Sequence, residues 1–396
     1  MVRWFWILFL YLALFEIFSI LPARVKPGST GEGPLFVTGA IHVPVSGSQS
    51  SAKLDRLAKA AKRSDLDFVV AANLDRAFAP GTAGHHNGVD IFTEFEASTP
   101  AGHALLFYSH TDAAKLSDKQ LKDLAWRHFL GSESHRGVFV VVAHPSSYFT
   151  PWERLDRFPD GIELINLRSL VEFQATESPL SFALTALTAP LNPYLAALRL
   201  FEPNARDFRG WDAVNAVSPG HFGVVATDDL SDWPLVDRLG VPLPPWERTL
   251  KVASNVVFPE STLSEDFAVR RSQIYRALRE GRSALLFQAI HPFDGNDWTL
   301  TCGAKQYRSG DKFALREKGC EFVVRTPSTL GMQKRLVLWR DGAVVSEVAS
   351  AKDEERIAVD HDGAYRLEVW VKAASLLRVL LNREIPYLFY NPMYVR

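Results

Sequence analysis

The chain has 396 residues, of which 47% are hydrophobic and 22% are charged, and its formal net charge is −1. This composition excludes a disordered or fibrous protein and allows a sizeable buried core, most simply in two domains. Lysine and arginine are scattered along the chain, so the sequence shows no basic cluster of the kind that binds a nucleic-acid backbone. We therefore expect no nucleic-acid partner.

The first segment of the chain is strongly apolar. Residues 4–21 include only Glu16 and Ser19 as polar exceptions, and they approach the ~20 residues needed to cross a bilayer core. Leu21-Pro22-Ala23 offers only a poor signal-peptide cleavage site. We predict one uncleaved transmembrane helix within residues 1–27, followed by a flexible linker over 28–34.

Charge alone leaves the orientation of this segment open. Arg3 on one side is balanced by Arg24 and Lys26 on the other, so the positive-inside rule is nearly neutral. A lone N-terminal apolar segment most often acts as an export signal. We therefore expect a membrane protein whose main body is extracytoplasmic, in the periplasm.

From residue 35 onward, short apolar runs alternate with amphipathic helical stretches, which is typical of an α/β domain. Helices are expected at 52–63 and 264–280, where apolar side chains recur at helical spacing. The expected strands are short, apolar and mostly β-branched or aromatic, at 35–43, 68–72, 88–97, 103–108, 138–143, 162–165, 222–226 and 284–289. This repetition predicts a βα barrel over residues 35–289.

One apolar stretch does not fit the barrel pattern. Residues 180–201 are interrupted by Pro190 and Pro193 and are too broken for a membrane-spanning helix. We expect them to form a buried or membrane-facing helical insertion.

After residue 289 the helical periodicity disappears. Strand-like runs are separated by turn pairs such as Asp341-Gly342 and Asp362-Gly363. This pattern of strand-like runs and turns predicts a small all-β, sandwich-like domain over 290–396. Cys302 and Cys320 lie in this region, and the sequence is compatible both with a disulfide and with two buried thiols.

Five side chains that can bind metal lie near the ends of the predicted strands: His42, Glu96, His103, His144 and Asp228. Barrel active sites are built from the C-terminal ends of strands. Imidazole and carboxylate ligands suit zinc, manganese or iron. Each residue taken singly also fits a core hydrogen bond or a cap, so the prediction depends on the whole set. We predict all five as metal ligands and all but His103 as catalytic.

The order and local context of these residues resemble the PHP (polymerase and histidinol phosphatase) domain family. The family's opening Asp-Leu-His-x-His, Ala-His-Pro strand end, Gly-Ile-Glu-x-x-Asn strand and late Ser-Asp-x-His have counterparts at residues 40–44, 143–145, 161–166 and 227–230. The resemblance covers about residues 35–290. It implies a distorted (β/α)7-type, TIM-like barrel and a divalent-metal phosphoesterase site. The ending over 391–395 is similar to that of members with a β-rich C-terminal domain.

Several of the family's ligand positions are changed. Pro44 stands where the family has its second histidine, Asn73-Leu74 replace an Asp-His pair, and Leu230 replaces the last histidine. Proline and leucine side chains cannot ligate a metal. The resemblance therefore implies a reduced site that holds a single ion or none. His85-His86 could supply substitute ligands, and a solvated loop pair is the alternative.

Two functions remain open from the sequence. The first is a membrane-anchored, metal-dependent phosphoesterase acting on a phosphate-ester small molecule, with Asn73 or Arg168 orienting the phosphate. The second is a catalytically inactive pseudoenzyme that binds a ligand or an envelope protein partner. A glycosidase using Glu94 and Glu96 is disfavoured, because residues two apart on one strand do not provide opposed carboxylates.

Overall fold

The computed structural model describes residues 35–45, 51–108, 115–131, 137–152, 160–188, 196–197, 200, 205–228, 246–314, 319–326, 333–372 and 384–396. The predicted transmembrane helix and linker lie outside these residues. Within the described ranges, no helix is both long enough and apolar enough to cross a membrane.

Seven strands form a closed barrel, the number that the family resemblance implies. They are hydrogen-bonded in chain order, and Ile41 of the first strand pairs with Ala226 of the last to close the ring. The ring contains β1 (Val37–Pro44), β2 (Phe68–Leu74), β4 (Val89–Thr99), β5 (Gly102–Tyr108), β6 (Val138–Val142), β7 (Gly161–Asn166) and β8 (Phe222–Ala226). The eighth strand expected from the sequence, β10 (Ser283–Leu286), lies outside this ring.

The barrel departs from a regular alternation of strand and helix. Strand β5 runs antiparallel to both β4 and β6, while the other strand pairs of the ring are parallel. A tight turn joins β4 to β5 and leaves no room for a helix. The short strand β3 (Gly84–His86) pairs with the start of β4. In the described part of the barrel region, the helices are α2 (Ser51–Arg63), α3 (Asp118–Phe129), α4 (Leu167–Glu177), α5 (Pro179–Thr188), α7 (Ala205–Val217), α9 (Trp246–Thr249) and α10 (Phe267–Arg279).

Aromatic rings fill the half of the barrel in which the parallel strands begin. A Cβ atom at Gly39 would lie 2.3 Å from the ring of Phe68, so only glycine leaves room for this ring. Tyr275 of α10 makes edge contacts with Phe92, Phe107 and Phe139. Helix α10 therefore closes the end of the barrel at which the parallel strands begin, and the opposite end carries the polar side chains.

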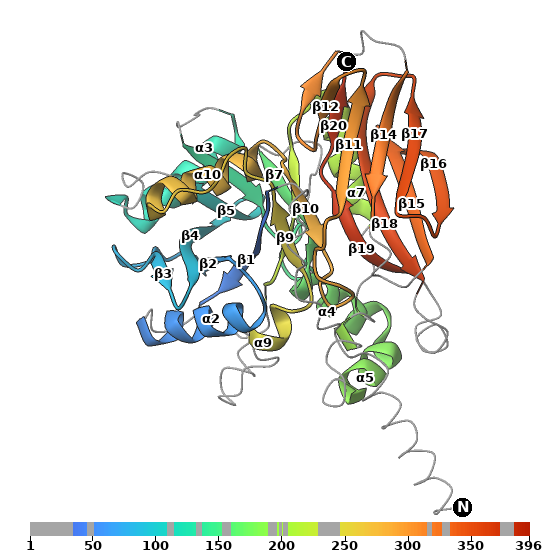
Figure 1. The fold of residues 1–396 in the computed structure, drawn as a ribbon. Helices are drawn as coiled ribbons and strands as arrows, with labels where there is room; N and C mark the ends of the chain where they lie inside the picture. The colour runs from blue at the N-terminus through green and yellow to red at the C-terminus, as the bar shows by residue number, and fades with distance from the viewer. Residues whose placement is uncertain are drawn as a thin grey trace, which may run out of the picture.

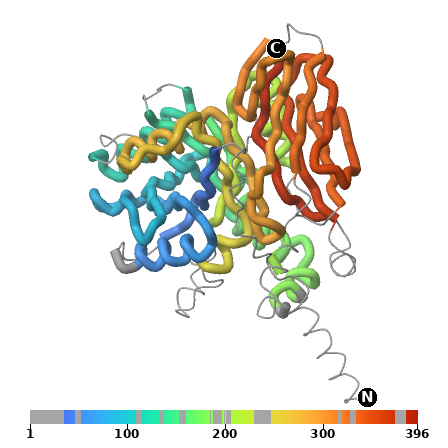
Figure 2. Tube along the Cα trace, viewed as in Figure 1, coloured from blue at the N-terminus to red at the C-terminus, as the bar shows by residue number. Residues whose placement is uncertain are grey.

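Two antiparallel strands connect the barrel to the C-terminal β region. β9 (Ser254–Val257) pairs with β1 of the ring and with β10, and β10 pairs with β19 (Ile385–Tyr390). Figure 1 shows β9 and β10 between the barrel and the C-terminal strands, and Figure 2 follows the same path along the chain. The barrel and the β region are therefore joined by one continuous sheet.

The C-terminal β region has two layers. One layer extends the barrel sheet through β13 (Lys312–Phe313), β15 (Gln333–Arg340), β16 (Ala343–Ser350), β18 (Gly363–Lys372), β19 and β20 (Met393–Val395). The other contains β11 (Asp297–Cys302), β12 (Lys305–Tyr307), β14 (Cys320–Arg325) and β17 (Glu354–Val359). Phe322 packs on Tyr365, and Trp298 packs on Tyr390 across the layers. This arrangement is the predicted sandwich-like packing.

Cys302 and Cys320 form a disulfide between β11 and β14. The sequence left this pairing open, and the structure decides for the disulfide over two free thiols. It joins two adjacent antiparallel strands of the smaller layer.

The buried side chain of Asn391 joins three segments of the chain. Its amide nitrogen donates to the backbone oxygens of Gly223 and Ser283, and its amide oxygen accepts from the backbone nitrogen of Gly223. These bonds connect β8 and β10 to the segment between β19 and β20. The C-terminal motif quoted from the sequence therefore holds the barrel and the β region together.

A second connection is a buried arginine. Arg366 of β18 donates two hydrogen bonds to the carboxylate of Asp212 on α7, at 2.7 and 2.9 Å, and it also bonds to Glu368. Its guanidinium carbon lies 4.5 Å from the centre of the Trp339 ring. Only 3% of Arg366 is exposed. The contact between α7 and β18 is therefore built around a paired, buried charge.

Candidate functional site

Backbone geometry at the end of β1 directs His42 toward the barrel axis. The β1–β2 register shifts between Ala40 and Val43, and His42 within this bulge has a φ of 57°. A left-handed conformation at a non-glycine residue is costly and is often found at functional sites. The buried His42 ring lies 2.7 Å from Glu163 through Nδ1 and 3.2 Å from Glu96 through Nε2.

Glu96 lies at the centre of a group of three histidines. One of its oxygens, Oε1, lies 2.9 Å from Nδ1 of His103 and 3.1 Å from Nε2 of His144, while the other faces His42. His144 lies two residues after the end of β6 and also has a positive φ, of 31°. Strands β1, β4 and β5 and the end of β6 thus bring four of the five predicted residues into direct contact.

The fifth predicted residue, Asp228, is buried beside this group, after β8. Asn166 at the end of β7 donates to Asp228 at 3.3 Å and to Glu163 at 2.9 Å. Glu163 in turn accepts a 2.6 Å bond from the backbone nitrogen of His144. The sequence prediction assigned no role to Glu163 or Asn166, although both lie in the Gly-Ile-Glu-x-x-Asn segment that contributed to the resemblance.

Opposite charges in the cluster shift the pKa values of His42 and Glu96 in opposite directions. Burial lowers the pKa of His42, but the charges of Glu163, Glu96 and Asp228 outweigh burial and raise it well above its usual value. Burial raises the pKa of Glu96, but His42 and hydrogen bonds from two further histidines bring it well below its usual range. The cluster therefore favours positive charge next to its carboxylates.

The donor set fits a divalent metal ion. Ligand atoms of Glu96, His103 and His144 lie within 4.8 Å of one another. Histidine nitrogen and carboxylate oxygen bind zinc at about 2.0–2.2 Å, so a small rearrangement of these three side chains would let them enclose one ion. Glu163 lies against Nδ1 of His42 and leaves Nε2 directed at the cluster, which is how metal-binding histidines are usually oriented.

Arg168 of α4 places a positive charge beside the histidine cluster. Arg168 is two residues after Asn166, and its Nε donates to Glu172 at 3.0 Å. Burial lowers the pKa of Arg168, but Asp228 and Glu172 outweigh burial and raise it. Arg168 therefore stays charged next to the carboxylate cluster, where an anionic group of a ligand could bind it.

The loop after β6 is fixed to α7 by a buried acid. Ser146 donates to Asp207 at 2.5 Å. Burial raises the pKa of Asp207 to about 7. Because this value exceeds the unfolded-state pKa of about 4, the folded state binds the proton more tightly and stability falls as the pH rises through this interval.

Replacing Asp207 with asparagine is expected to flatten the pH dependence of stability. Between pH 5 and pH 8 the wild-type protein should lose stability on the order of a few kcal/mol more than Asp207→Asn. Thermal denaturation of both proteins across this range measures the difference. Parallel curves for the two proteins would show that Asp207 does not titrate differently on folding.

The structure places several other candidates away from the cluster. His85 pairs with Asp90 at the beginning of β4, and His86 pairs with Asp55 of α2. Both therefore lie at the other end of β4 from Glu96. The hypothesis that these two histidines supply substitute metal ligands is wrong. Glu94, one of the two carboxylates of the disfavoured glycosidase hypothesis, is fully buried against Arg271. Leu74, at a changed ligand position, is 49% exposed.

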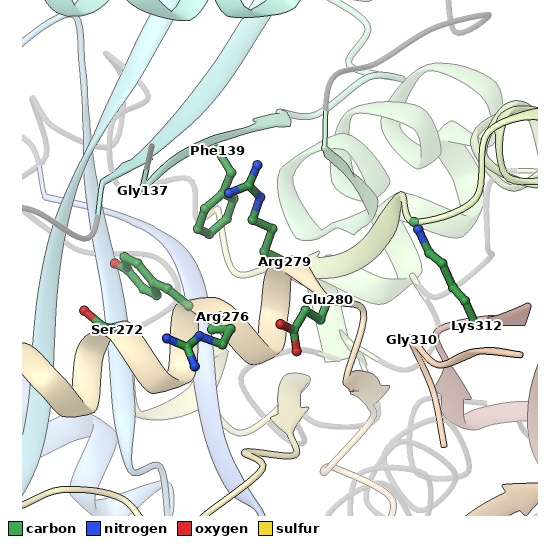
Figure 3. Close-up of a pocket in the computed structure, with 10 residues that line it drawn as sticks. Gly137, Phe139, Ser272, Arg276, Arg279, Glu280, Gly310 and Lys312 are labelled. Carbon is green, nitrogen blue, oxygen red and sulfur yellow. The ribbon is translucent and has the colours of Figure 1, made fainter. Parts of the chain in front are cut away.

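A cavity of about 570 Å³ lies at the opposite end of the barrel (Figure 3). Its lining includes Gly137 and Gly220, which precede β6 and β8, together with Arg276 and Arg279 of α10 and Lys312 of β13. His144 and Asp228, by contrast, follow β6 and β8. This cavity is therefore separate from the histidine cluster and does not hold the predicted ligands.

No family model matches the chain, and no curated protein matches it in sequence. Among solved structures it is similar to a two-domain protein from Bacteroides vulgatus that contains a predicted PHP-like metal-dependent phosphoesterase. The identity is 13% and the TM-score is 0.35, over 87% of this chain and 96% of that chain. Similarity at this level defines neither the chemistry of the site nor its substrate.

Proposed function

We propose that the protein is a metal-dependent phosphoesterase with a reduced metal site. The observation that carries this proposal is the convergence of His42, His103 and His144 on Glu96, with Asp228 alongside, at the end of a closed barrel where active sites are built. His103, His144 and Glu96 would hold one zinc, manganese or iron ion, with His42 and Asp228 as further ligands.

The surrounding residues support hydrolysis of an anionic ester. A bound divalent ion supplies a water molecule of lowered pKa at neutral pH. Arg168 would bind the phosphoryl oxygens, and Asn166 holds Asp228 in place through its amide. Asn73, the other predicted phosphate-orienting residue, is buried at the end of β2. We further propose that residues 1–27 anchor the protein in the membrane with its body in the periplasm.

A binding protein without catalytic activity is the second candidate. The observation that favours it is that the polar groups of the cluster already satisfy one another, because Glu96 and Glu163 together contact all three histidines. Pro44 and Leu74 also remove two ligand positions that the family uses. In that case the barrel would bind an unreactive ligand or an envelope protein.

Metal analysis of the full-length protein, purified without chelator or metal-binding tag, tests the proposal. About one equivalent of zinc, manganese or iron, together with hydrolysis of p-nitrophenyl phosphate or its bis ester that a chelator abolishes, is the expected result. Metal far below one equivalent after ions are added back to folded protein would contradict it and favour the binding role.

A further inference from the structure

Four large apolar or aromatic side chains are exposed on the segments that follow β6 and β7. Tyr148 and Phe149 are 60% and 63% exposed, Phe173 is 48% exposed, and Leu180 is 75% exposed. We call these four residues the apolar rim. Large exposed apolar side chains that gather in one part of a surface often mark a binding or membrane-contact site.

Hydrogen bonds fix the apolar rim to the candidate site. Glu172 of α4, which is 2% exposed, accepts bonds from the hydroxyl of Ser147 at 2.8 Å and from the backbone nitrogen of Tyr148 at 3.0 Å. The same carboxylate bonds to Arg168. Thr150, at the end of this loop, lies 3.4 Å from Nδ1 of His144. The rim is therefore held beside the charged side chain that we propose as the phosphate ligand.

The rim continues from α4 onto α5. Gln174 donates to Ser181 at 3.2 Å, which places the residues next to them, Phe173 and Leu180, on two helices in contact. Helix α5 contains only apolar, serine and threonine residues, and it lies at the periphery of the molecule in Figure 1. Such a helix has nothing to repel an alkyl chain or the surface of a bilayer.

The chemistry of the rim favours an alkyl chain over a sugar. Phe149, Phe173 and Leu180 offer no hydrogen-bonding group, and Leu180 has no flat face for stacking. The N-terminal segment favours the same ligand, because the 14 residues from Pro22 to Leu35 span at most about 50 Å. If residues 4–21 cross a bilayer, the barrel stays within this distance of lipid.

We propose that the substrate is an amphiphilic phosphate ester, with its phosphate at Arg168 and the histidine cluster and its apolar chain on the apolar rim. This inference rests on the proposed phosphoesterase function and names its substrate class. The rim supplies affinity for the chain, and the charged cluster supplies recognition of the head group.

The test compares two esters with the same phosphomonoester group, using the full-length protein in detergent micelles. Dioctanoyl phosphatidate carries apolar chains, and glycerol 3-phosphate carries none. The wild-type protein is expected to show at least about a tenfold higher kcat/KM for phosphatidate. The double variant Phe149→Ser/Leu180→Ser should lose about tenfold of this preference through KM, while its kcat/KM for glycerol 3-phosphate stays unchanged.

A matched control is the pair Val344→Ser/Val345→Ser on β16, where both residues are also exposed. This control should behave as the wild type. An unchanged preference in the rim variant, or a wild-type preference for the ester without chains, would overturn the inference while the phosphoesterase function stands.

If neither ester is hydrolysed, the proposed activity fails and binding decides the inference. The Kd for radiolabelled dioctanoyl phosphatidate, at a fixed mole fraction in micelles, should then rise about tenfold in the rim variant. Equal Kd values for the rim variant and the wild type would overturn the inference.

Discussion

Replacing His144 with alanine is expected to lower the metal content from about one equivalent to below a tenth and to lower turnover at least about a hundredfold. The reason is that His144 is one of three residues whose ligand atoms lie together around Glu96, and even residues that only orient ligands change affinity 10–100-fold. Elemental analysis and hydrolysis of p-nitrophenyl phosphate on the same preparation measure the two effects.

The matched control for this variant is His361→Ala. His361 is a histidine of the C-terminal β region whose side chain is 63% exposed, and its replacement should change neither quantity. Because His144 has a positive φ, alanine there adds a small backbone strain. His103→Ala, which replaces a ligand on a regular strand, separates strain from loss of metal. Full metal content in both ligand variants would contradict the proposed site.

Replacing Arg366 with methionine is expected to destabilise the protein by about 3–5 kcal/mol, because it leaves two buried carboxylates without their cation. Asp212 and Glu368 both depend on this guanidinium. Burial raises the pKa of Asp212, and the arginine lowers it. The free energy of unfolding from denaturant titration measures the loss.

Arg356→Met provides the matched comparison for the buried arginine. Arg356 pairs with Glu354 and Glu321, but its side chain is 55% exposed. Solvent screens such exposed pairs, so Arg356→Met should lower the free energy of unfolding far less than Arg366→Met does. Replacing Arg366, Asp212 and Glu368 together with apolar residues should recover most of the stability that Arg366→Met loses. A loss below about 1 kcal/mol in Arg366→Met would mean that water reaches the two carboxylates.

The barrel strands were predictable because each is a short run with a strong local signal. Residues 68–72 and 138–143, for example, are almost entirely apolar and lie on strands buried along nearly their whole length. β9 was missed, since four residues, Ser254–Val257, include a serine and an asparagine and resemble a loop. Asn255 is polar because its side chain bonds to the backbone of Val225, a partner that no local pattern reveals.

The site residues were predictable where a histidine or an acidic residue lies near the C-terminal end of a predicted strand. His42 lies near the end of β1, and His144 and Asp228 come shortly after β6 and β8, so chain position alone brings them to one end of the barrel. Glu163 was not assigned because it lies within an apolar strand, and its role depends on facing the histidines across the barrel. The Gly-Ile-Glu-x-x-Asn pattern contains Glu163, so treating its glutamate as a candidate site residue would have identified Glu163.

The burial of Glu94 could not be predicted from the local sequence pattern. Its alternation with Glu96 is equally compatible with a solvated face and with a buried one. The structure buries it because Arg271 and Tyr275 supply a cation and a hydroxyl from α10, which comes much later in the chain. A carboxylate whose partners lie so far away cannot be assigned to the interior from its neighbours in sequence.

The continuous sheet through β10 and β19 determines when the chain can complete its fold during synthesis. Leu285 pairs with Phe389, and Asn391 bonds to Gly223, so these contacts form only after Phe389 and Asn391 have been synthesised. Contacts between distant residues slow folding and leave strand edges exposed meanwhile. The edge of β10 that pairs with β19 therefore stays unpaired on the nascent chain until β19 has been synthesised.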